Sequence, residues 1–198
     1  MLFRGRFWFG LELIRSFVAF DIEEAAVISN LSKVQDTLLG TGADLKLVKP
    51  ENIHITLRFL GDIAADMVDK IHGEMERVQF SPFDVDIKGV GVFPNPRHIS
   101  VVWAGIHQGA DELRAVFDQL EPRLRTLGFS PDYKGFSPHL TIARVRTGRN
   151  RDALAEQLKI LEGFEFGSVR AECLRLKKSV LTPQGPIYSV LRETCHKT

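Results

Sequence analysis

The chain has 198 residues, of which 44% are hydrophobic and 26% are charged, enough to bury a sizeable core in one or two small domains. Lysine and arginine number 26 against 25 acidic residues, and a formal net charge of +1 excludes a protein that coats nucleic acid through its overall charge. Any contact with nucleic acid must come from a local basic patch.

The two cysteines, Cys173 and Cys195, are too few for a disulfide framework and lack the Cys-x-x-Cys spacing of a zinc or redox site. We therefore expect a reducing, cytoplasmic location. The apolar segment at the start of the chain is too short to span a membrane and lacks the cleavage site of a signal peptide, so no membrane association is expected.

Residues 1–14 stand apart from the rest of the chain, because the strand pattern begins only at Arg15. We interpret them as an N-terminal extension that an early start codon would produce. The alternative is an apolar arm that docks on the fold or on a partner.

The elements predicted from hydrophobic periodicity fall into two series. The first contains a strand over 16–21, a helix over 27–38, a strand over 53–60, a helix over 64–79, a strand over 83–90 and a turn at 94–96. The second contains a strand over 100–104, a helix over 111–128, a strand over 139–145, a helix over 151–161, a strand over 169–176, a turn at 183–186 and a strand over 188–191.

The second series repeats the first in order and in spacing. Phe17 lies 37 residues before His54, and Val101 lies 38 residues before His139. We infer an internal repeat, about 15–96 and 97–193, within a single domain over 15–198. The predicted fold is α+β, with two pseudo-symmetric lobes that each hold a mainly antiparallel sheet with covering helices. The active site is expected in the cleft between the lobes.

Each repeat contains a His-x-Thr strand at the matching point, His54-Ile-Thr56 and His139-Leu-Thr141. Composition alone predicts about 0.3 such triplets in a chain of this length. Side chains alternate between the faces of a strand. Alternation places one set on the apolar face (Ile53, Ile55, Leu57, Phe59) and the other toward the cleft (His54, Thr56, Arg58). His139 and Thr141 likewise oppose Leu140 and Ile142.

Two histidines near a pKa of about 6.5 can hold opposite protonation states, one as acid and one as base. A threonine hydroxyl can donate to a phosphoryl oxygen and hold the neighbouring imidazole. Two His/Thr pairs therefore suit an in-line displacement at phosphorus, in which attack and departure occur on opposite sides. A metal site is the competing interpretation, but the spacings typical of histidine ligands are missing and neither strand has a carboxylate on the same face.

A basic segment surrounds the second motif. It includes Lys134 and Arg144 with Phe136 interleaved, a combination that suits phosphate neutralisation and base stacking, so these three are candidate RNA-binding residues. A solvated basic face is the plainer alternative. Alternation puts Arg144 away from His139 unless the strand bulges before it.

The strings His54-Ile-Thr-Leu-Arg-Phe-Leu-Gly61 and Ser137-Pro-His-Leu-Thr-Ile-Ala-Arg144 resemble the paired motifs of the 2H phosphoesterase superfamily. Within it the sequence is most similar to the branch of RNA 2′,3′-cyclic phosphodiesterases, also called 2′-5′ RNA ligases. The resemblance runs from about Arg15 to Glu193.

This resemblance implies hydrolysis of a terminal RNA 2′,3′-cyclic phosphate to a 2′-phosphate, without metal or other cofactor. It implies that His54 is the proton donor, that His139 is the proton acceptor, and that Thr56 and Thr141 bind the phosphate. The implied partner is RNA with such an end, tRNA-like fragments included, and 2′-5′ ligation would be the reverse-type reaction. We expect a monomer. The alternatives are an esterase for small cyclic nucleotides or 2′-5′ oligoadenylate, and a non-catalytic RNA- or nucleotide-binding module.

Overall fold

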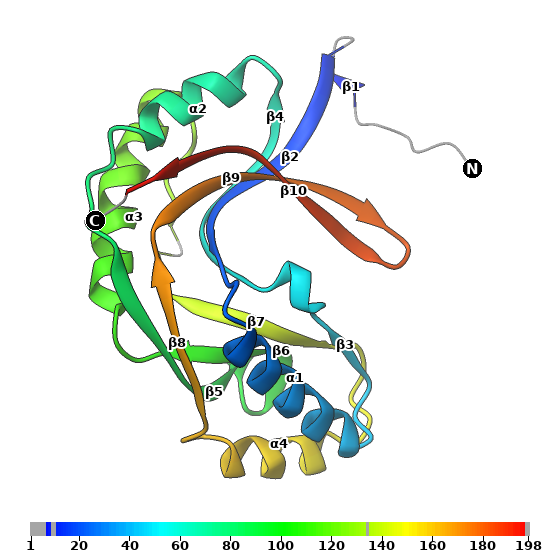
Figure 1. Cartoon of the computed structure of the whole chain (residues 1–198). Helices are drawn as coiled ribbons and strands as arrows, with labels where there is room; N and C mark the ends of the chain where they lie inside the picture. Colours follow the sequence, from blue (N-terminus) through cyan, green and yellow to red (C-terminus); the bar gives the residue numbers. More distant parts are fainter. Residues whose placement is uncertain (1–6, 9–10, 134, 197–198) are drawn as a thin grey trace.

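The computed structural model describes all residues except 1–6, 9–10, 134 and 197–198. It confirms the α+β prediction: four helices lie on the outside of a curled antiparallel sheet (Figure 1). The helices are α1 (Ala25–Gly40), α2 (Met67–Met75), α3 (Ala110–Thr126) and α4 (Arg151–Ile160), with a 3-10 helix η1 (Pro50–Asn52). The strands are β1 (Phe7–Trp8), β2 (Leu11–Asp21), β3 (Leu45–Leu47), β4 (His54–Ala64), β5 (Phe83–Asn95), β6 (His98–Ile106), β7 (His139–Val145), β8 (Glu165–Ala171), β9 (Cys173–Thr182) and β10 (Gly185–Cys195).

The strand order is β10-β9-β2-β4-β7-β6-β5-β8, with β1 added to β2 and β3 added to β7. Between β4 and β7 only one residue pair is in register, Ile55 with Leu140, so the sheet divides there into two half-sheets. Helices α2 and α3 cover the half-sheet β10-β9-β2-β4, and α1 and α4 cover the half-sheet that contains β7 (Figure 1). This is the expected bilobal arrangement.

The lobes do not coincide with the two halves of the chain. Strand β5 comes from the first repeat but lies between β6 and β8, while β9 and β10 come from the second repeat but extend the sheet from β2. Each lobe thus contains strands of both repeats. This exchange ties the lobes together without a separate linker.

Helix α1 shows how a short pattern sets local structure. Its apolar side chains recur at four, three and four residues, and Val27, Leu31, Val34 and Leu38 are all buried. Gly42 comes next with φ +70°, a conformation that ends the helix.

Several predicted boundaries were wrong. Strand β2 begins at Leu11 rather than near Arg15, and Leu13 pairs with Ala64, so the last residues of the presumed extension belong to the sheet. The stretch 169–176 is two strands that separate at Glu172, and α2 is shorter than 64–79. The short elements β3 and η1 have no periodic pattern that could have predicted them.

Cys173 and Cys195 are bonded as a disulfide across paired positions of β9 and β10. This bond could not be predicted from the sequence, because two cysteines 22 residues apart carry no pairing signal of their own. Within the described residues, no helix combines the length and the apolar character needed to cross a membrane.

Candidate active site

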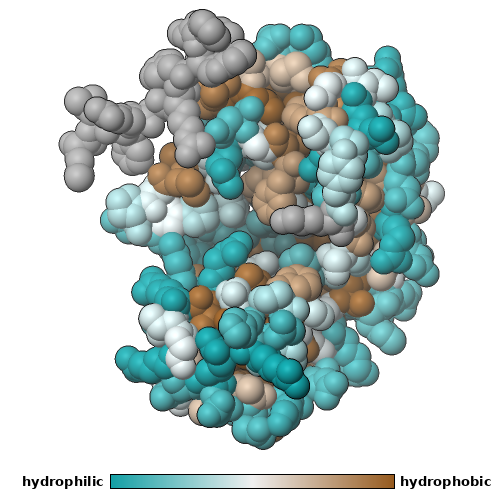
Figure 2. Space-filling model, turned by 180° about the vertical axis from the view of Figure 1, so that it is seen from behind, coloured by the Kyte–Doolittle hydropathy of each residue, from teal (hydrophilic) through white to brown (hydrophobic). Residues whose placement is uncertain are grey.

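A cavity of about 490 Å³ lies where the two half-sheets meet. Its lining includes His54 and Thr56 from β4 together with His139 and Thr141 from β7. Seen from behind, the molecule has a hollow between its upper and lower parts, edged by both hydrophilic and hydrophobic side chains (Figure 2). The four residues of the two motifs thus share one water-accessible space.

The two histidines have the same hydrogen-bond geometry. Nδ1 of His54 lies 2.8 Å from the carbonyl oxygen of Asn52, and Nδ1 of His139 lies 2.7 Å from that of Ser137. A carbonyl oxygen only accepts, so each Nδ1 must carry a proton and donate it. In each ring, Nε2 is therefore the nitrogen left to exchange a proton with a substrate.

Burial lowers the pKa of both histidines. That of His54 falls from 6.5 to about 4, mainly because burial disfavours the charged ring, with the Lys177 ammonium adding to the effect. The pKa of His139 is also lowered, first by burial, with the Arg144 guanidinium contributing. In the absence of substrate, these shifts favour the neutral form of both rings at pH 7. An anionic phosphate bound between them would favour the protonated ring that an acid catalyst needs.

Aromatic rings hold both imidazoles in place. The ring of Phe17 lies 4.8 Å from that of His54, and Tyr188 approaches His54 edge-on at 5.3 Å. The ring of Phe93 meets that of His139 edge-on with 5.0 Å between the ring centres, and the ring of Trp103 is tilted against it at 6.2 Å. These contacts restrict ring rotation and account for the loss of hydration.

Strand β4 bulges just after its motif, which corrects the alternation predicted for it. In register with β2, Thr56 pairs with Ala19 and Arg58 pairs with Val18, so Leu57 is an extra residue. Arg58 therefore lies on the helix side, where its Nε is 2.8 Å from the Glu121 carboxylate of α3. Phe59, predicted for the core, instead lines the cavity with 62% of its surface exposed.

Strand β7 has the same bulge at the same point. Thr141 pairs with Trp103 and Ala143 with Val102, so Ile142 is the extra residue. Its carbonyl oxygen instead accepts from the backbone N–H of Val48 at 2.9 Å and from the Gln35 amide at 2.8 Å.

The bulge in β7 returns Arg144 to the cavity face beside Thr141. The sequence analysis expected Arg144 to point away from His139 unless β7 bulges before it, and the structure has this bulge. Arg144 and Phe59 each lie five residues after a histidine and occupy equivalent positions in the two lobes.

The structure does not place the other candidate RNA-binding residues, Phe136 and Lys134, in the cavity lining. Phe136 is partly buried and stacks on Phe117 of α3 at 5.1 Å, outside the cavity lining, so the structure gives it a packing role. Lys134 lies outside the described residues. The side chains of the basic segment do not gather at one site. Arg146 pairs with Asp44, and Arg149 donates to the carbonyl oxygen of Gly42.

The lining contains several residues that the sequence did not single out. Arg15, Lys46 and Lys49 join Arg144 around the cavity, and Tyr188 and Ser179 come from the strands β10 and β9. No aspartate or glutamate occurs in this lining, as far as the structure describes it. A cavity with cations and aromatic faces but without carboxylates suits an anionic, base-bearing ligand.

The family model of the LigT-like phosphoesterases matches the chain twice, over residues 22–103 and 106–188, in agreement with an internal duplication. An RNA 2′,3′-cyclic phosphodiesterase of Aeropyrum pernix is 40% identical over 167 residues, 84% of this chain and 95% of the relative. One from Methanothermobacter thermautotrophicus is 40% identical over 178 residues, 89% and 95% of the two chains.

Solved structures agree on the fold. A protein of Thermus thermophilus superposes with a TM-score of 0.75 at 24% identity, covering 92% of this chain and 97% of its own. LigT of E. coli, in complex with 3′-AMP, gives a TM-score of 0.75 at 21% identity, covering 94% and 100%. With the paired motifs in one cavity and the family model matched in both halves, the chain belongs to the LigT-like phosphoesterases, a family of 2H phosphoesterases.

Proposed function

We propose that this protein hydrolyses 2′,3′-cyclic phosphate ends of RNA to 2′-phosphates. The observation that carries the proposal is the equivalent placement of two imidazoles, each fixed through Nδ1, on neighbouring strands that line one cavity. The relatives that share 40% of their residues with the chain bear the name of this activity.

In the proposed reaction His139 removes a proton from water, whose oxygen attacks the phosphorus. His54, protonated when the anionic substrate binds, gives its proton to the departing 3′ oxygen as the P–O3′ bond breaks. Thr56 and Thr141 donate hydrogen bonds to the phosphoryl oxygens, whose charge increases in the transition state. The assignment of acid and base rests on the family resemblance, because the two histidines have the same immediate hydrogen bonds. With a 5′-hydroxyl in place of water, the reversed displacement would form a 2′-5′ linkage.

The cations around the cavity support RNA rather than a small cyclic nucleotide as substrate. Lys46 on β3 and Lys49 next to η1 line the cavity together with Arg15 and Arg144, which gives it more cationic groups than one cyclic phosphate requires. Phe59 offers an exposed aromatic face for a base, and such stacking contributes about 1–3 kcal/mol per base. RNA ends, those of tRNA-like fragments included, are the proposed substrates.

We further propose that the protein acts as a monomer in the cytoplasm. Both motifs belong to one chain, so the proposed site needs no second copy. A cytoplasmic location requires that the Cys173–Cys195 bond persist in the cytosol, as disulfides do in hyperthermophilic organisms. A count of free thiols in protein isolated from cytosol without reductant would test whether the Cys173–Cys195 bond persists in that location.

The experiment that tests the activity is product analysis on an oligoribonucleotide with a 2′,3′-cyclic end. A 2′-phosphate product is expected, with faster turnover than on a cyclic mononucleotide. A 3′-phosphate product would reject the assigned leaving group. Binding of the oligonucleotide without any reaction would favour a binding module.

A further inference from the structure

The internal repeat lets the surroundings of the two histidines be compared position by position. Across β2 and β4, Asp21 is the registered partner of His54; across β6 and β7, Gly105 is the partner of His139. One strand further out, Lys177 of β9 pairs with Phe17, and Phe93 of β5 pairs with Val101. The acidic residue and the lysine beside His54 are thus replaced by glycine and phenylalanine beside His139.

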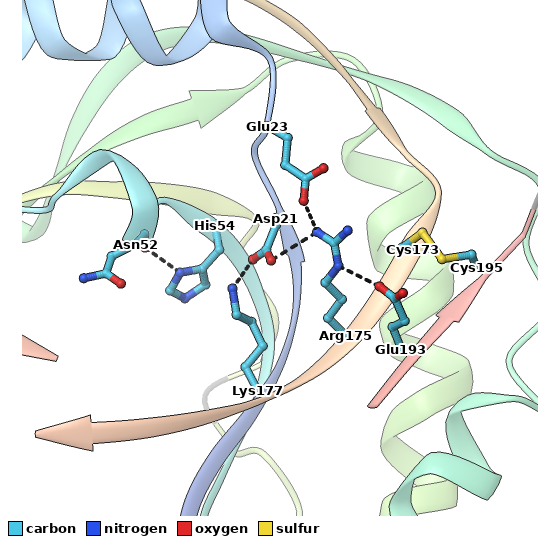
Figure 3. Close-up of polar contacts among 9 residues, drawn as sticks. All are labelled: Asp21, Glu23, Asn52, His54, Cys173, Arg175, Lys177, Glu193 and Cys195. Carbon is cyan, nitrogen blue, oxygen red and sulfur yellow. Dashed lines mark hydrogen bonds and ion pairs between the residues drawn. A yellow bond between two sulfur atoms is a disulfide. The ribbon is translucent and has the colours of Figure 1, made fainter. Parts of the chain in front are cut away.

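The charged residues beside His54 form a buried ion pair. The Lys177 ammonium contacts the Asp21 carboxylate at 2.5 Å, and the two side chains are only 7% and 14% exposed. In the close-up, the ammonium lies next to the imidazole of His54, with the carboxylate between it and Arg175 (Figure 3). Neither Lys177 nor Asp21 lines the cavity, so both act on His54 from behind rather than on a bound ligand.

Two other titratable side chains lie close to His54, and a third charged side chain binds Asp21. Tyr188 of β10 lies edge-on, and the Lys177 ammonium lies 5.9 Å from the centre of its ring. His139 of β7 faces His54 across the cavity. Arg175 is the second partner of Asp21, at 3.1 Å, and is itself held by Glu23 and Glu193. Arg175 would therefore keep the carboxylate paired if the lysine charge were removed.

We propose that Lys177 and Asp21 are positioning residues that make two otherwise equivalent histidines unequal, by setting the proton affinity of His54 from behind. The inference deepens the proposed function, because it concerns the proton that the proposed acid transfers. Lys177 opposes the imidazolium of His54 and Asp21 favours it. Burial is the main cause of the lowered pKa of His54, and the lysine adds to it while the carboxylate opposes it with a smaller effect.

The test is a titration of the two imidazoles by NMR, in the absence of substrate, on the wild-type protein and on Lys177→Met. Methionine keeps an apolar chain of similar length but removes the charge. The titration midpoint of His54 is expected to move to higher pH by about one pH unit, because a nearby like charge is removed. The midpoint of His139 is expected to stay nearly the same. The double variant D21N/K177M removes both opposing charges, so its His54 midpoint is expected between the other two.

Two further variants separate charge from structure. Lys177→Arg retains the charge and is expected to retain the wild-type midpoint. Lys178→Met makes the same chemical change one residue on, and alternation along β9 places that side chain on the opposite face from Lys177. Its midpoint is expected to match the wild type.

An unchanged His54 midpoint in folded Lys177→Met would overturn the inference, as would an equal shift in Lys178→Met. The titration needs no substrate, so it stands apart from the proposed activity. A shifted midpoint in a protein that leaves cyclic ends intact would reject the function and keep the inference. Normal hydrolysis of cyclic ends with an unshifted His54 midpoint would keep the proposed function and reject the inference about Lys177.

Discussion

Ile55 and Leu140 form the single registered pair that joins the two half-sheets, and each comes directly after a histidine of the cavity. Both side chains are fully buried in the shared core. Because neighbouring residues of a strand point to opposite faces, packing this pair inward turns His54 and His139 outward into the same space. The separation and orientation of the two imidazoles are therefore set by the core rather than by loops.

Leu140→Ala is expected to destabilise the protein by about 2–5 kcal/mol, because it leaves a cavity where the half-sheets meet. Denaturant unfolding followed by circular dichroism measures the change. Truncation of the exposed Leu181, on the hairpin of β9 and β10, serves as the control and should cost far less. An equal loss of unfolding free energy in both variants would show that Leu140, where the half-sheets meet, contributes no more to stability than an exposed leucine.

Gln35→Leu is expected to weaken substrate binding as well as stability. The Gln35 amide is buried and donates to the carbonyl oxygens of Val48 and Ile142, the second being the bulged residue of β7. The Ile142 oxygen would keep the Val48 N–H, and loss of the two buried amide hydrogen bonds is expected to cost about 1–3 kcal/mol. A relaxed bulge would displace Arg144, so KM should rise more than kcat falls in steady-state kinetics. A variant that is destabilised but keeps its KM would show that Arg144 does not depend on the bulge.

The charge of Arg144 is expected to matter for oligonucleotides. Arg144→Gln should raise KM and make the logarithm of the apparent affinity less steeply dependent on the logarithm of salt concentration, by about one unit of slope. Arg146→Gln is the matched control, because Arg146 lies two residues on, outside the cavity lining, and pairs with Asp44. The same loss of slope in both variants would assign the effect to the general charge of the strand.

The pH dependence is set by the lowered pKa values of the histidines. The productive enzyme holds one proton on the pair. Above the higher pKa both rings are neutral and the acid is missing; below about 4 both are charged and the base is missing. Both pKa values lie below 6.5 in the free enzyme, so kcat/KM should peak on the acid side of pH 6.5 and fall about tenfold per pH unit above its optimum.

In the complex, the phosphate anion favours the charged ring, so the alkaline limb of kcat should lie at higher pH than that of kcat/KM. Rate profiles from pH 4 to 9 on a cyclic-ended oligonucleotide provide both curves. An alkaline limb of kcat/KM above pH 7 would contradict the desolvated histidines.

Much of the site could be predicted from the sequence because strand alternation is a local property. The faces of His54, Thr56, His139 and Thr141 depend only on the residues beside them, and α1 is determined by its own apolar spacing. The repeat then indicated that the two motifs face one another.

The two bulges could not be predicted, because an extra residue in a strand is defined only against its partner strand. Arg58 and Phe59 therefore changed faces relative to a regular alternation. The exchange of β5 and β9 between lobes, and with it the placement of Lys177 behind His54, is a matter of long-range pairing. Lys46 and Lys49 reach the cavity through β3 and η1, which carry no periodic signal.

The most direct test of the two-histidine mechanism is the turnover of His54→Ala and His139→Ala on an RNA with a 2′,3′-cyclic end. Each substitution should lower kcat by about 10²–10⁴-fold, the usual contribution of an acid or base, with the circular dichroism spectrum unchanged. His107→Ala, which removes an exposed imidazole outside the cavity lining, should retain full activity. Wild-type turnover in both cavity variants would contradict acid–base catalysis by this pair.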